Sequence, residues 1–301
     1  MAGEFLTTVL DRFAVSRWEG APRLESRSGS HVLPVRTADG RSAYLKATPA
    51  ALGPAAIEAA RRELCFYREL APVAAVRTPA LLESVDDERG VAVLLEDADE
   101  PRDAPQWTVR MWADLGRALA ALHAMPVPTG ARWRRPNAMG DLDIEQIGAF
   151  WSTSLPEVAR LLDRRCVLGE QMRALPPVFV HGDCHTENVT VADGALVFCD
   201  WQSAGIGRRS GDLAFLSVRA TPAGVSVPPV LLDAYERNSS CDPLLLRRAV
   251  IAEELAILVF EWPNYAAFAN AVGIARVQRR TRELARQWLR TEALTAEPPG
   301  A

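Results

Sequence analysis

The sequence HGDCHTENVTVADGALVFCDW, residues 181–201, holds the most concentrated set of reactive side chains in the chain. The apolar, β-branched runs on both sides of Ala192-Asp193-Gly194 predict two short strands joined by a tight turn. Asp183 precedes this hairpin, and Asn188 and Asp200 stand at its two ends. Folding of the hairpin is therefore expected to bring Asn188 and Asp200 close together.

The types of side chain at the base of this hairpin indicate a chemistry. A carboxylate and an amide oxygen are hard ligands of the kind that Mg²⁺ prefers, and Mg²⁺ also takes phosphate oxygens and water. Asn188 and Asp200 therefore form a candidate magnesium site. Asp183 stands apart from that pair and is placed to accept a proton from a hydroxyl group.

Further toward the N-terminus, the sequence predicts a second hairpin that carries an unusual residue. HVLPVRT (31–37) and SAYLKA (42–47) alternate as strands do, and Ala38-Asp39-Gly40 forms the turn between them. Lys46, near the end of the returning strand, is the only lysine in a chain with 33 arginines. Because arginine serves wherever only positive charge is needed, the retained lysine indicates a site that requires its compact ammonium group.

The remaining pattern predicts an α+β fold with a small β-rich N-terminal lobe and a larger, mainly helical C-terminal lobe. A helix is expected over 54–70 and strands over 80–86 and 91–97, after which the polar stretch 96–105 interrupts the hydrophobic rhythm. The expected domains are residues 1–95, a connector at 96–106, and residues 107–301. Further helices are predicted over residues 107–125, 143–151, 156–175, 228–238, 243–262 and 273–294.

Composition excludes several classes of protein. The chain has 301 residues, of which 49% are hydrophobic and 24% charged, which is typical of a folded globular protein. No apolar run approaches the roughly 18–20 residues that span a bilayer. The formal net charge of −4 and the lack of a basic block argue against nucleic acid as a partner. Five widely spaced cysteines without a CxxC pair, and Glu4 and Asp11 near the N-terminus, predict a cytoplasmic protein without a signal peptide.

The pattern HGDxHxxN, followed by Asp200-Trp201 and by GDLA at 211–214, resembles the aminoglycoside phosphotransferase family. That resemblance implies a two-lobed, protein-kinase-like fold. It also implies that Asp183 is the catalytic base or orients the acceptor hydroxyl, and that Asn188 and Asp200 hold Mg²⁺. Asp212 and His181 would brace the catalytic loop by hydrogen bonds.

The resemblance extends to the N-terminal part of the chain, where it implies a nucleotide site. Lys46 matches the strand lysine that holds the ATP phosphates, and Glu63 in RRELCFYREL matches the helix glutamate that pairs with it. VLLED (93–97), which includes Glu96, matches the hinge that receives the purine. A phosphate-covering loop is expected at Ser28, Gly29 and Ser30, although it has fewer glycines than such loops usually have.

The acceptor site is less defined by the sequence. Glu254 and Glu261 lie seven residues apart in a predicted helix, which would place them on one face, where they would meet a cationic substrate or pair with nearby arginines. His185 either contacts the substrate or phosphate or packs within the loop. Cys184 and Thr186-Glu187 depart from the commoner loop HGDLHPGN, and Glu187 adds a carboxylate beside the proposed metal site.

These features predict an enzyme that transfers the γ-phosphoryl group of ATP or GTP, with Mg²⁺, to a hydroxyl of a small molecule, such as an antibiotic that carries amino groups. The alternatives are a kinase of a metabolite or protein, a nucleotide-binding module without catalysis, and a hydrolase. The hydrolase would hold zinc or manganese through His181, Asp183 and His185.

Overall fold

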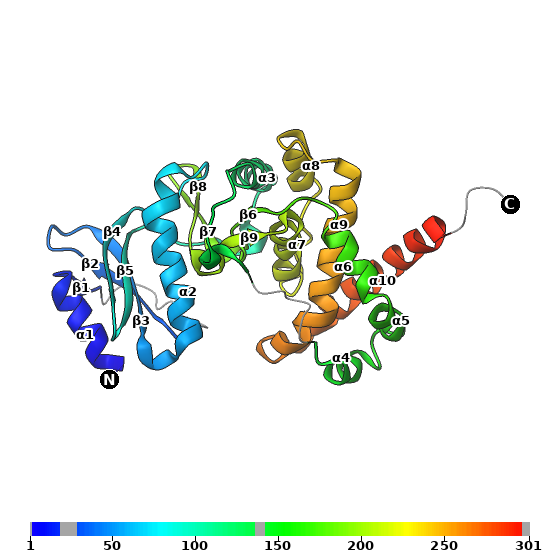
Figure 1. Cartoon of the computed structure of the whole chain (residues 1–301), viewed down its shortest axis with the longest axis horizontal. Helices are drawn as coiled ribbons and strands as arrows, with labels where there is room; N and C mark the ends of the chain where they lie inside the picture. The colour runs from blue at the N-terminus through cyan, green and yellow to red at the C-terminus, as the bar shows by residue number, and fades with distance from the viewer. Residues whose placement is uncertain (1, 19–28, 136–141, 297–301) are drawn as a thin grey trace. The chain divides into compact units, whose positions relative to one another are not determined.

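The computed structural model describes residues 2–18, 29–135 and 142–296 (Figure 1). Contacts divide the chain into two compact units, of which the first comprises residues 1–101 and 188–204. The second comprises residues 102–187 and 205–301. The hairpin that carries Asn188 and Asp200 thus groups with the N-terminal part of the chain.

The first unit contains a five-stranded antiparallel sheet with the strand order β1-β2-β3-β5-β4. The strands predicted for this region are confirmed, and the structure adds the two-residue strand β1. The turn between β2 and β3 lies at Thr37–Arg41, where Gly40 adopts a φ of +83°. The strands are β1 Ser16–Arg17, β2 His31–Arg36, β3 Ser42–Pro49, β4 Leu81–Asp87 and β5 Gly90–Glu96.

Lys46 points away from the apolar core that covers one face of this sheet. Helix α1 (Ala2–Arg12) packs its buried apolar side chains against Leu45 and Ala47 of β3. Because successive side chains of a strand point to opposite faces, Lys46 points to the other face of the sheet. That face is the one toward which α2 directs Glu63.

Helix α2 (Pro54–Cys65) begins with a proline in its first position and continues into a π-helical turn at Phe66–Leu70. Together these segments confirm the helix predicted over 54–70. Gly53, at φ +94°, precedes the helix, so the chain turns there in a conformation that glycine adopts without strain. The first unit also contains the predicted hairpin of β7 (Val189–Ala192) and β8 (Ala195–Phe198).

The second unit is mainly helical and has a two-stranded sheet of β6 (Val178–Val180) and β9 (Gly205–Gly207). The expected helix over 156–175 is two helices, because Arg164 leaves the helical conformation at φ −97° and ψ 12°. The sequence did not predict α7, whose first residues, RSGD, are polar and lack apolar periodicity. The helices are α3 Val109–His123, α4 Ile144–Trp151, α5 Val158–Asp163, α6 Arg165–Met172, α7 Arg209–Ala220, α8 Val230–Arg237, α9 Pro243–Ala256 and α10 Ala271–Ala296.

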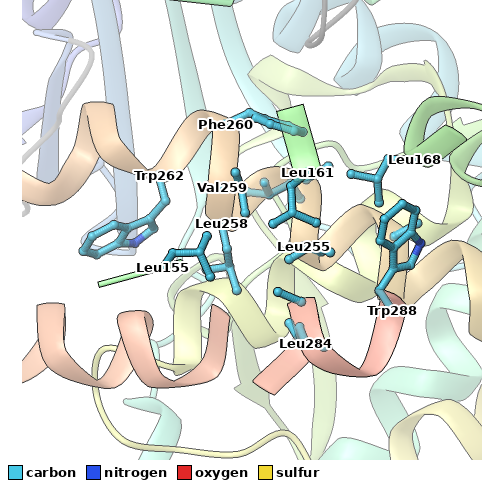
Figure 2. Close-up of a cluster of buried hydrophobic side chains, with 14 of the residues drawn as sticks. Leu155, Leu161, Leu168, Leu255, Leu258, Val259, Phe260, Trp262, Leu284 and Trp288 are labelled. Carbon is cyan, nitrogen blue, oxygen red and sulfur yellow. The ribbon is translucent and has the colours of Figure 1, made fainter. Parts of the chain in front are cut away.

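A large apolar cluster holds the helices of the second unit together (Figure 2). It draws on α4, α5, α6, α7, α9 and α10, and Leu255, Leu258 and Leu284 are among its fully buried members. At this burial, each leucine contributes about 2 kcal/mol of transfer free energy. None of the helices within the described residues is both long and apolar enough to cross a membrane.

Candidate active site

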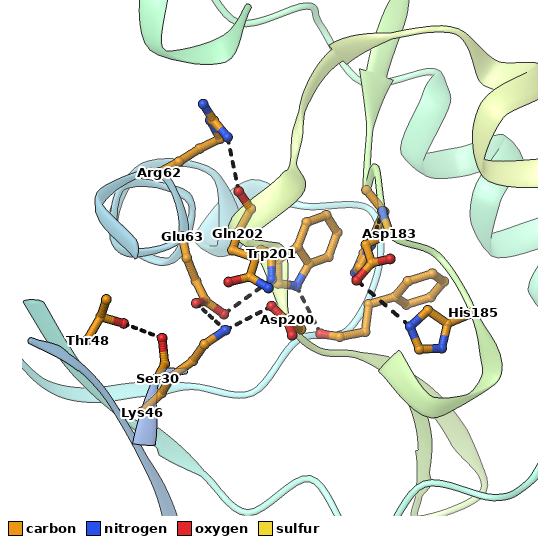
Figure 3. Close-up of polar contacts among 12 residues, drawn as sticks. Ser30, Lys46, Thr48, Arg62, Glu63, Asp183, His185, Asp200, Trp201 and Gln202 are labelled. Carbon is orange, nitrogen blue, oxygen red and sulfur yellow. Dashed lines mark hydrogen bonds and ion pairs between the residues drawn. The ribbon is translucent and has the colours of Figure 1, made fainter. Parts of the chain in front are cut away.

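The only lysine of the chain lies in a buried ion-pair cluster within the first unit (Figure 3). The Nζ atom of Lys46 lies 2.7 Å from Oε2 of Glu63 and donates a hydrogen bond of 2.8 Å to Oδ1 of Asp200. The Lys46 side chain is 11% exposed and the Glu63 side chain 2% exposed. The structure thus brings together the strand lysine, the helix glutamate and the hairpin aspartate that the sequence singled out.

The carboxylates of Glu63 and Asp200 determine the protonation state of Lys46. Burial lowers the pKa of Lys46, but the charges of Glu63 and Asp200 and their hydrogen bonds outweigh it and raise that pKa above its usual value. Lys46 is therefore a permanent ammonium ion at neutral pH. A buried ammonium ion held by two carboxylates is suited to exchange one of these contacts for a phosphate oxygen.

Asp200 stands at the end of β8 in a strained backbone conformation, with φ +61° and ψ 70°. Strain of this kind in a residue other than glycine is typical of functional positions, because the surrounding structure must hold it. At the same end of the hairpin, the amide N–H of Cys199 donates to the carbonyl of Asn188 at 2.8 Å. The register therefore places Asn188 and Asp200 at one end of the hairpin.

These two side chains fit a magnesium ion by their chemistry. Both supply hard oxygen ligands, and the Asp200 side chain is 33% exposed, so an ion can reach it. Two protein ligands leave further coordination positions for water and phosphate oxygens, which is how Mg²⁺ is usually bound beside nucleotides. The proposed roles of Asn188 and Asp200 as metal ligands stay a prediction.

Trp201 connects the hairpin to α2. Its ring stacks on Phe66 with centroids 3.8 Å apart and planes 11° apart, and its backbone N–H donates to Oε1 of Glu63 at 3.3 Å. Glu63 thus holds Lys46 with one oxygen and the hairpin backbone with the other. The sequence motifs FYREL and DW meet in this stack, a contact that sequence reasoning did not predict.

The expected phosphate-covering loop lies only partly within the described residues. Ser28 is outside them. Gly29 has φ +76°, and the buried Ser30 shares a 2.8 Å hydrogen bond with the hydroxyl of Thr48. Glu96 ends β5 with an exposed side chain, and its backbone N–H donates to the carbonyl of Ala80 at 2.9 Å. Nucleotide contacts of these residues stay predictions.

In the second unit, Asp212 anchors the loop that contains Asp183. Its Oδ2 accepts from the N–H of His181 and its Oδ1 from the N–H of Gly182, each at 2.8 Å. Gly182 has φ +84°, a conformation in which glycine is favoured. The N–H of Asp183 in turn donates to Nδ1 of His181 at 3.3 Å, so the backbone that leads into Asp183 is fixed.

A second histidine, His123, completes this support. Its Nε2 lies 3.1 Å from Oδ2 of Asp212, and its Nδ1 lies 2.9 Å from the hydroxyl of Tyr235. Burial alone would raise the pKa of Asp212, but the hydrogen bond from His123, the charges of both histidines and the Gly182 N–H lower it. Asp212 is therefore an ionised acceptor. Sequence reasoning missed His123, whose only signal was that it is one of four histidines.

His185 and Glu187 take part in further contacts of the same loop. The N–H of Glu187 donates to Nδ1 of His185 at 3.3 Å, which leaves the proton of a neutral ring on Nε2. That Nε2 lies 3.8 Å from Oδ2 of Asp183. Arg219 of α7 binds the Glu187 carboxylate at 3.0 Å. Arg219 therefore neutralises the extra carboxylate that distinguishes this loop.

The geometry does not favour the zinc-hydrolase alternative. A metal site would need His181 and His185 each to offer a ring nitrogen with a free lone pair. Each Nδ1 accepts a backbone N–H, so a neutral ring carries its proton on Nε2 and has no nitrogen left to bind a metal. Within residues 2–18, 29–135 and 142–296, no three His, Cys, Asp or Glu side chains are grouped so that they could hold a metal ion.

The two glutamates expected on one helical face are in different surroundings. Both oxygens of Glu254 bind Arg280, and Ser217 donates to it, as the arginine-pairing alternative foresaw. After α9 the chain forms a π-helical turn at Ile257–Glu261. The π-helical turn has more residues per turn than an α-helix, so Glu261 does not lie on the helical face that its spacing from Glu254 predicts. The charges that act on Glu261 are those of Glu253, Arg208 and Arg135. A substrate role for either glutamate stays a prediction.

Glu261 gives a prediction about pH and stability. Burial first, and then the charge of Glu253, raises the pKa of Glu261 to about 7 in the folded protein. Because this is above the usual value, stability is highest while Glu261 is protonated and falls as pH rises from about 4.5 to 7. Glu261→Gln should therefore stabilise the protein at pH 8 by on the order of 3 kcal/mol and much less at pH 5.

The measurement is urea unfolding of both proteins at pH 5 and pH 8. Glu170→Gln, which changes an exposed glutamate of the same unit, is the control and should show no such difference between the two pH values. Equal stabilisation by Glu261→Gln at both pH values would contradict the raised pKa.

Comparisons with known proteins identify the family and the fold of this chain. The model of the phosphotransferase enzyme family matches residues 23–249. Among solved structures, an amicoumacin kinase in complex with AMP-PNP and Ca²⁺ is 16% identical, with a TM-score of 0.58 over 93% of each chain.

Two further solved structures are similar. A Streptomyces rimosus aminoglycoside phosphotransferase in complex with ADP and streptomycin is 18% identical, with a TM-score of 0.52 over 84% of this chain and 97% of that one. A macrolide 2′-phosphotransferase type I is 17% identical, with a TM-score of 0.53 over 93% and 96%. A search of curated proteins finds no match. The solved structures confirm the predicted protein-kinase-like α+β fold.

Proposed function

Because the chain belongs to the phosphotransferase enzyme family, we propose that it transfers the γ-phosphoryl group of ATP or GTP to a hydroxyl of a small molecule. The observation that carries this proposal is the buried cluster of Lys46, Glu63 and Asp200. Such a cluster costs free energy to bury, since both signs of charge leave water. A role of the Lys46 ammonium group in binding the nucleotide phosphates would explain why the chain has this buried cluster in spite of that cost.

Asn188 and Asp200 would hold Mg²⁺ in this proposal. When bound, the ion neutralises negative charge on the phosphates and orients them. Asp200 also accepts a hydrogen bond from Lys46, so one carboxylate would help to position both positive groups. Glu63 keeps the lysine in place from the side of α2.

Asp183 is proposed as the base that orients the acceptor hydroxyl and accepts its proton. Phosphoryl transfer needs little covalent work from the protein, so the main requirement is accurate placement of the nucleophile. The backbone hydrogen bonds from Gly182 to Asp212 and from Asp183 to His181 hold the loop from which Asp183 would orient that nucleophile. His185, with Nε2 3.8 Å away, adds a positive dipole that stabilises the ionised carboxylate.

The proposed acceptor is an antibiotic or a similar small molecule that carries amino groups. Glu261 is only partly exposed, and burial and the charge of Glu253 raise its pKa to about 7 against the opposing charges of Arg208 and Arg135. An ammonium group of an acceptor would add a positive charge beside it. The amicoumacin and streptomycin complexes of the similar structures support this class of acceptor.

The test of the proposed function is transfer from radiolabelled ATP or GTP in the presence of Mg²⁺. The acceptors to compare are amino-bearing antibiotics, macrolides, hydroxylated amines and neutral sugars, with water as the background acceptor. We expect labelled product with at least one amino-bearing compound. Release of phosphate to water alone, or activity that requires Zn²⁺ without nucleotide, would contradict the proposal.

Asp200→Asn gives a prediction about the metal. The amide keeps the shape of the side chain but removes the charge of one of two proposed ligands, so the Mg²⁺ concentration for half-maximal rate should rise at least roughly tenfold. The control is Asp193→Asn at the tip of the same hairpin, where the side chain is 86% exposed. An unchanged Mg²⁺ requirement in Asp200→Asn would show that Asp200 does not bind the metal.

A further inference from the structure

The peptide group that joins Gly182 to Asp183 has an anchor outside the loop motif. The Nη2 group of Arg135 donates a hydrogen bond of 3.1 Å to the carbonyl oxygen of Gly182. The N–H of Asp183, on the same peptide group, donates to Nδ1 of His181. Arg135 therefore fixes the second polar atom of the peptide plane that precedes the proposed base.

Strand β9 leaves room for the Arg135 side chain. A Cβ atom added at Gly205 would lie 2.9 Å from Cγ of Arg135, and one added at Gly207 would lie 3.3 Å from its Nη1. Neither distance is compatible with an undisturbed arginine. The chain just before it is tied to the same strand, because Arg134 forms a parallel bridge with Ile206.

The charge of Arg135 also interacts with a carboxylate of this unit. The carboxylate of Glu261 interacts electrostatically with Arg135 and with Arg208, and Arg208 in turn binds Glu253 through two hydrogen bonds of 2.8 and 2.6 Å. The hydrogen bond to the Gly182 carbonyl favours one orientation of the planar donor groups of Arg135.

We propose that Arg135 is a positioning residue for phosphoryl transfer, which orients the Asp183 carboxylate by holding the Gly182 carbonyl. This inference rests on the proposed function of Asp183. Gly182, at φ +84°, has no side chain to restrict its rotation, so an external hydrogen bond is an effective restraint. Loss of the restraint lets the peptide plane rotate and displaces the base from the acceptor hydroxyl.

The expected effect is on turnover and not on nucleotide binding. A displacement of about 1 Å at a reacting group costs up to roughly 10²-fold in rate, so Arg135→Ala should lower kcat by roughly 10- to 100-fold. The KM for ATP should stay within about twofold, because Lys46, Glu63 and Asp200 do not depend on this hydrogen bond. Arg135→Lys should recover part of the rate, since lysine keeps one donor but lacks the planar fork.

The experiment compares Arg135→Ala, Arg135→Lys and Arg134→Ala in steady-state kinetics and in hydrogen exchange of the peptide that covers residues 181–187. Arg134 is the matched control, because it is an adjacent, exposed arginine. We expect faster amide exchange in that peptide for Arg135→Ala alone, with thermal unfolding unchanged. Exchange and kcat equal to those of the wild type would overturn the inference.

The two readouts separate this inference from the proposed function. Exchange reports the restraint on the loop even if no acceptor is found. If the wild-type protein transfers no phosphoryl group, the proposed function fails, and unaltered exchange in Arg135→Ala would still refute the restraint. If transfer occurs and Arg135→Ala matches the wild type, only the positioning role of Arg135 fails.

Discussion

Asp183→Ala should lower the turnover of phosphoryl transfer by roughly 10²–10⁴-fold, the usual contribution of a positioned acid–base group. Nucleotide affinity should survive, because the residues proposed to bind the phosphates and metal are Lys46, Asn188 and Asp200, with Glu63 holding the lysine. The hydrogen bonds of the loop run from main-chain N–H groups to the side chains of Asp212 and His181, so they remain possible after the substitution. The variant is therefore expected to fold normally.

The measurement is kcat and KM for ATP with the acceptor found in the panel, together with a binding titration of ATP and Mg²⁺. Asp163→Ala, which changes an exposed aspartate in the same unit, serves as a control for the loss of a carboxylate. An Asp183→Ala variant with the wild-type kcat would show that Asp183 is not the catalytic base.

Lys46→Met should lower both activity and stability. Loss of a preorganised electrostatic group typically costs roughly 10²–10³-fold in rate. The substitution also leaves Glu63, which is 2% exposed, without the cation that compensates it. Breaking a buried ion pair in this way destabilises a protein by roughly 3–5 kcal/mol.

A double variant separates the two effects. Lys46→Met combined with Glu63→Gln removes both buried charges, and replacement of a whole buried pair is often neutral for stability. We expect denaturant unfolding to show recovered stability while activity stays low. If the double variant also regains activity, the lysine is structural. If Lys46→Met is as stable and as active as the wild type, the ion pair contributes neither to stability nor to activity.

The sequence predicted the local elements of the first unit well, for a physical reason. Hairpins such as β2–β3 and β7–β8 are set by alternation and by a turn sequence, and both signals are local. Once the strand around Lys46 was located, its period of two fixed the face on which the lysine lies. The resemblance to a known family then selected Glu63 and Asp200 from 38 acidic residues.

Several elements that depend on distant partners were not predicted. The three-residue strand β9 exists only because it pairs with β6, and neither strand is long enough to show alternation. The π-helical turn at Ile257–Glu261 gives no pattern in the sequence, yet Glu261 at its end interacts electrostatically with Glu253 and Arg208, whereas Glu254 binds Arg280. Contacts such as Arg135 with Gly182 join positions 47 residues apart and required the structure.

The central claim is that the only lysine of the chain binds the phosphates of a nucleotide, and nuclear magnetic resonance tests it directly. Protein labelled with ¹⁵N-lysine contains one labelled ammonium group, so its signal needs no assignment. The raised pKa of Lys46 keeps that group protonated during the measurement. Titration with Mg²⁺ and AMP-PNP should shift this single signal until the site is saturated. An unshifted signal while calorimetry shows that the same nucleotide binds would contradict the account.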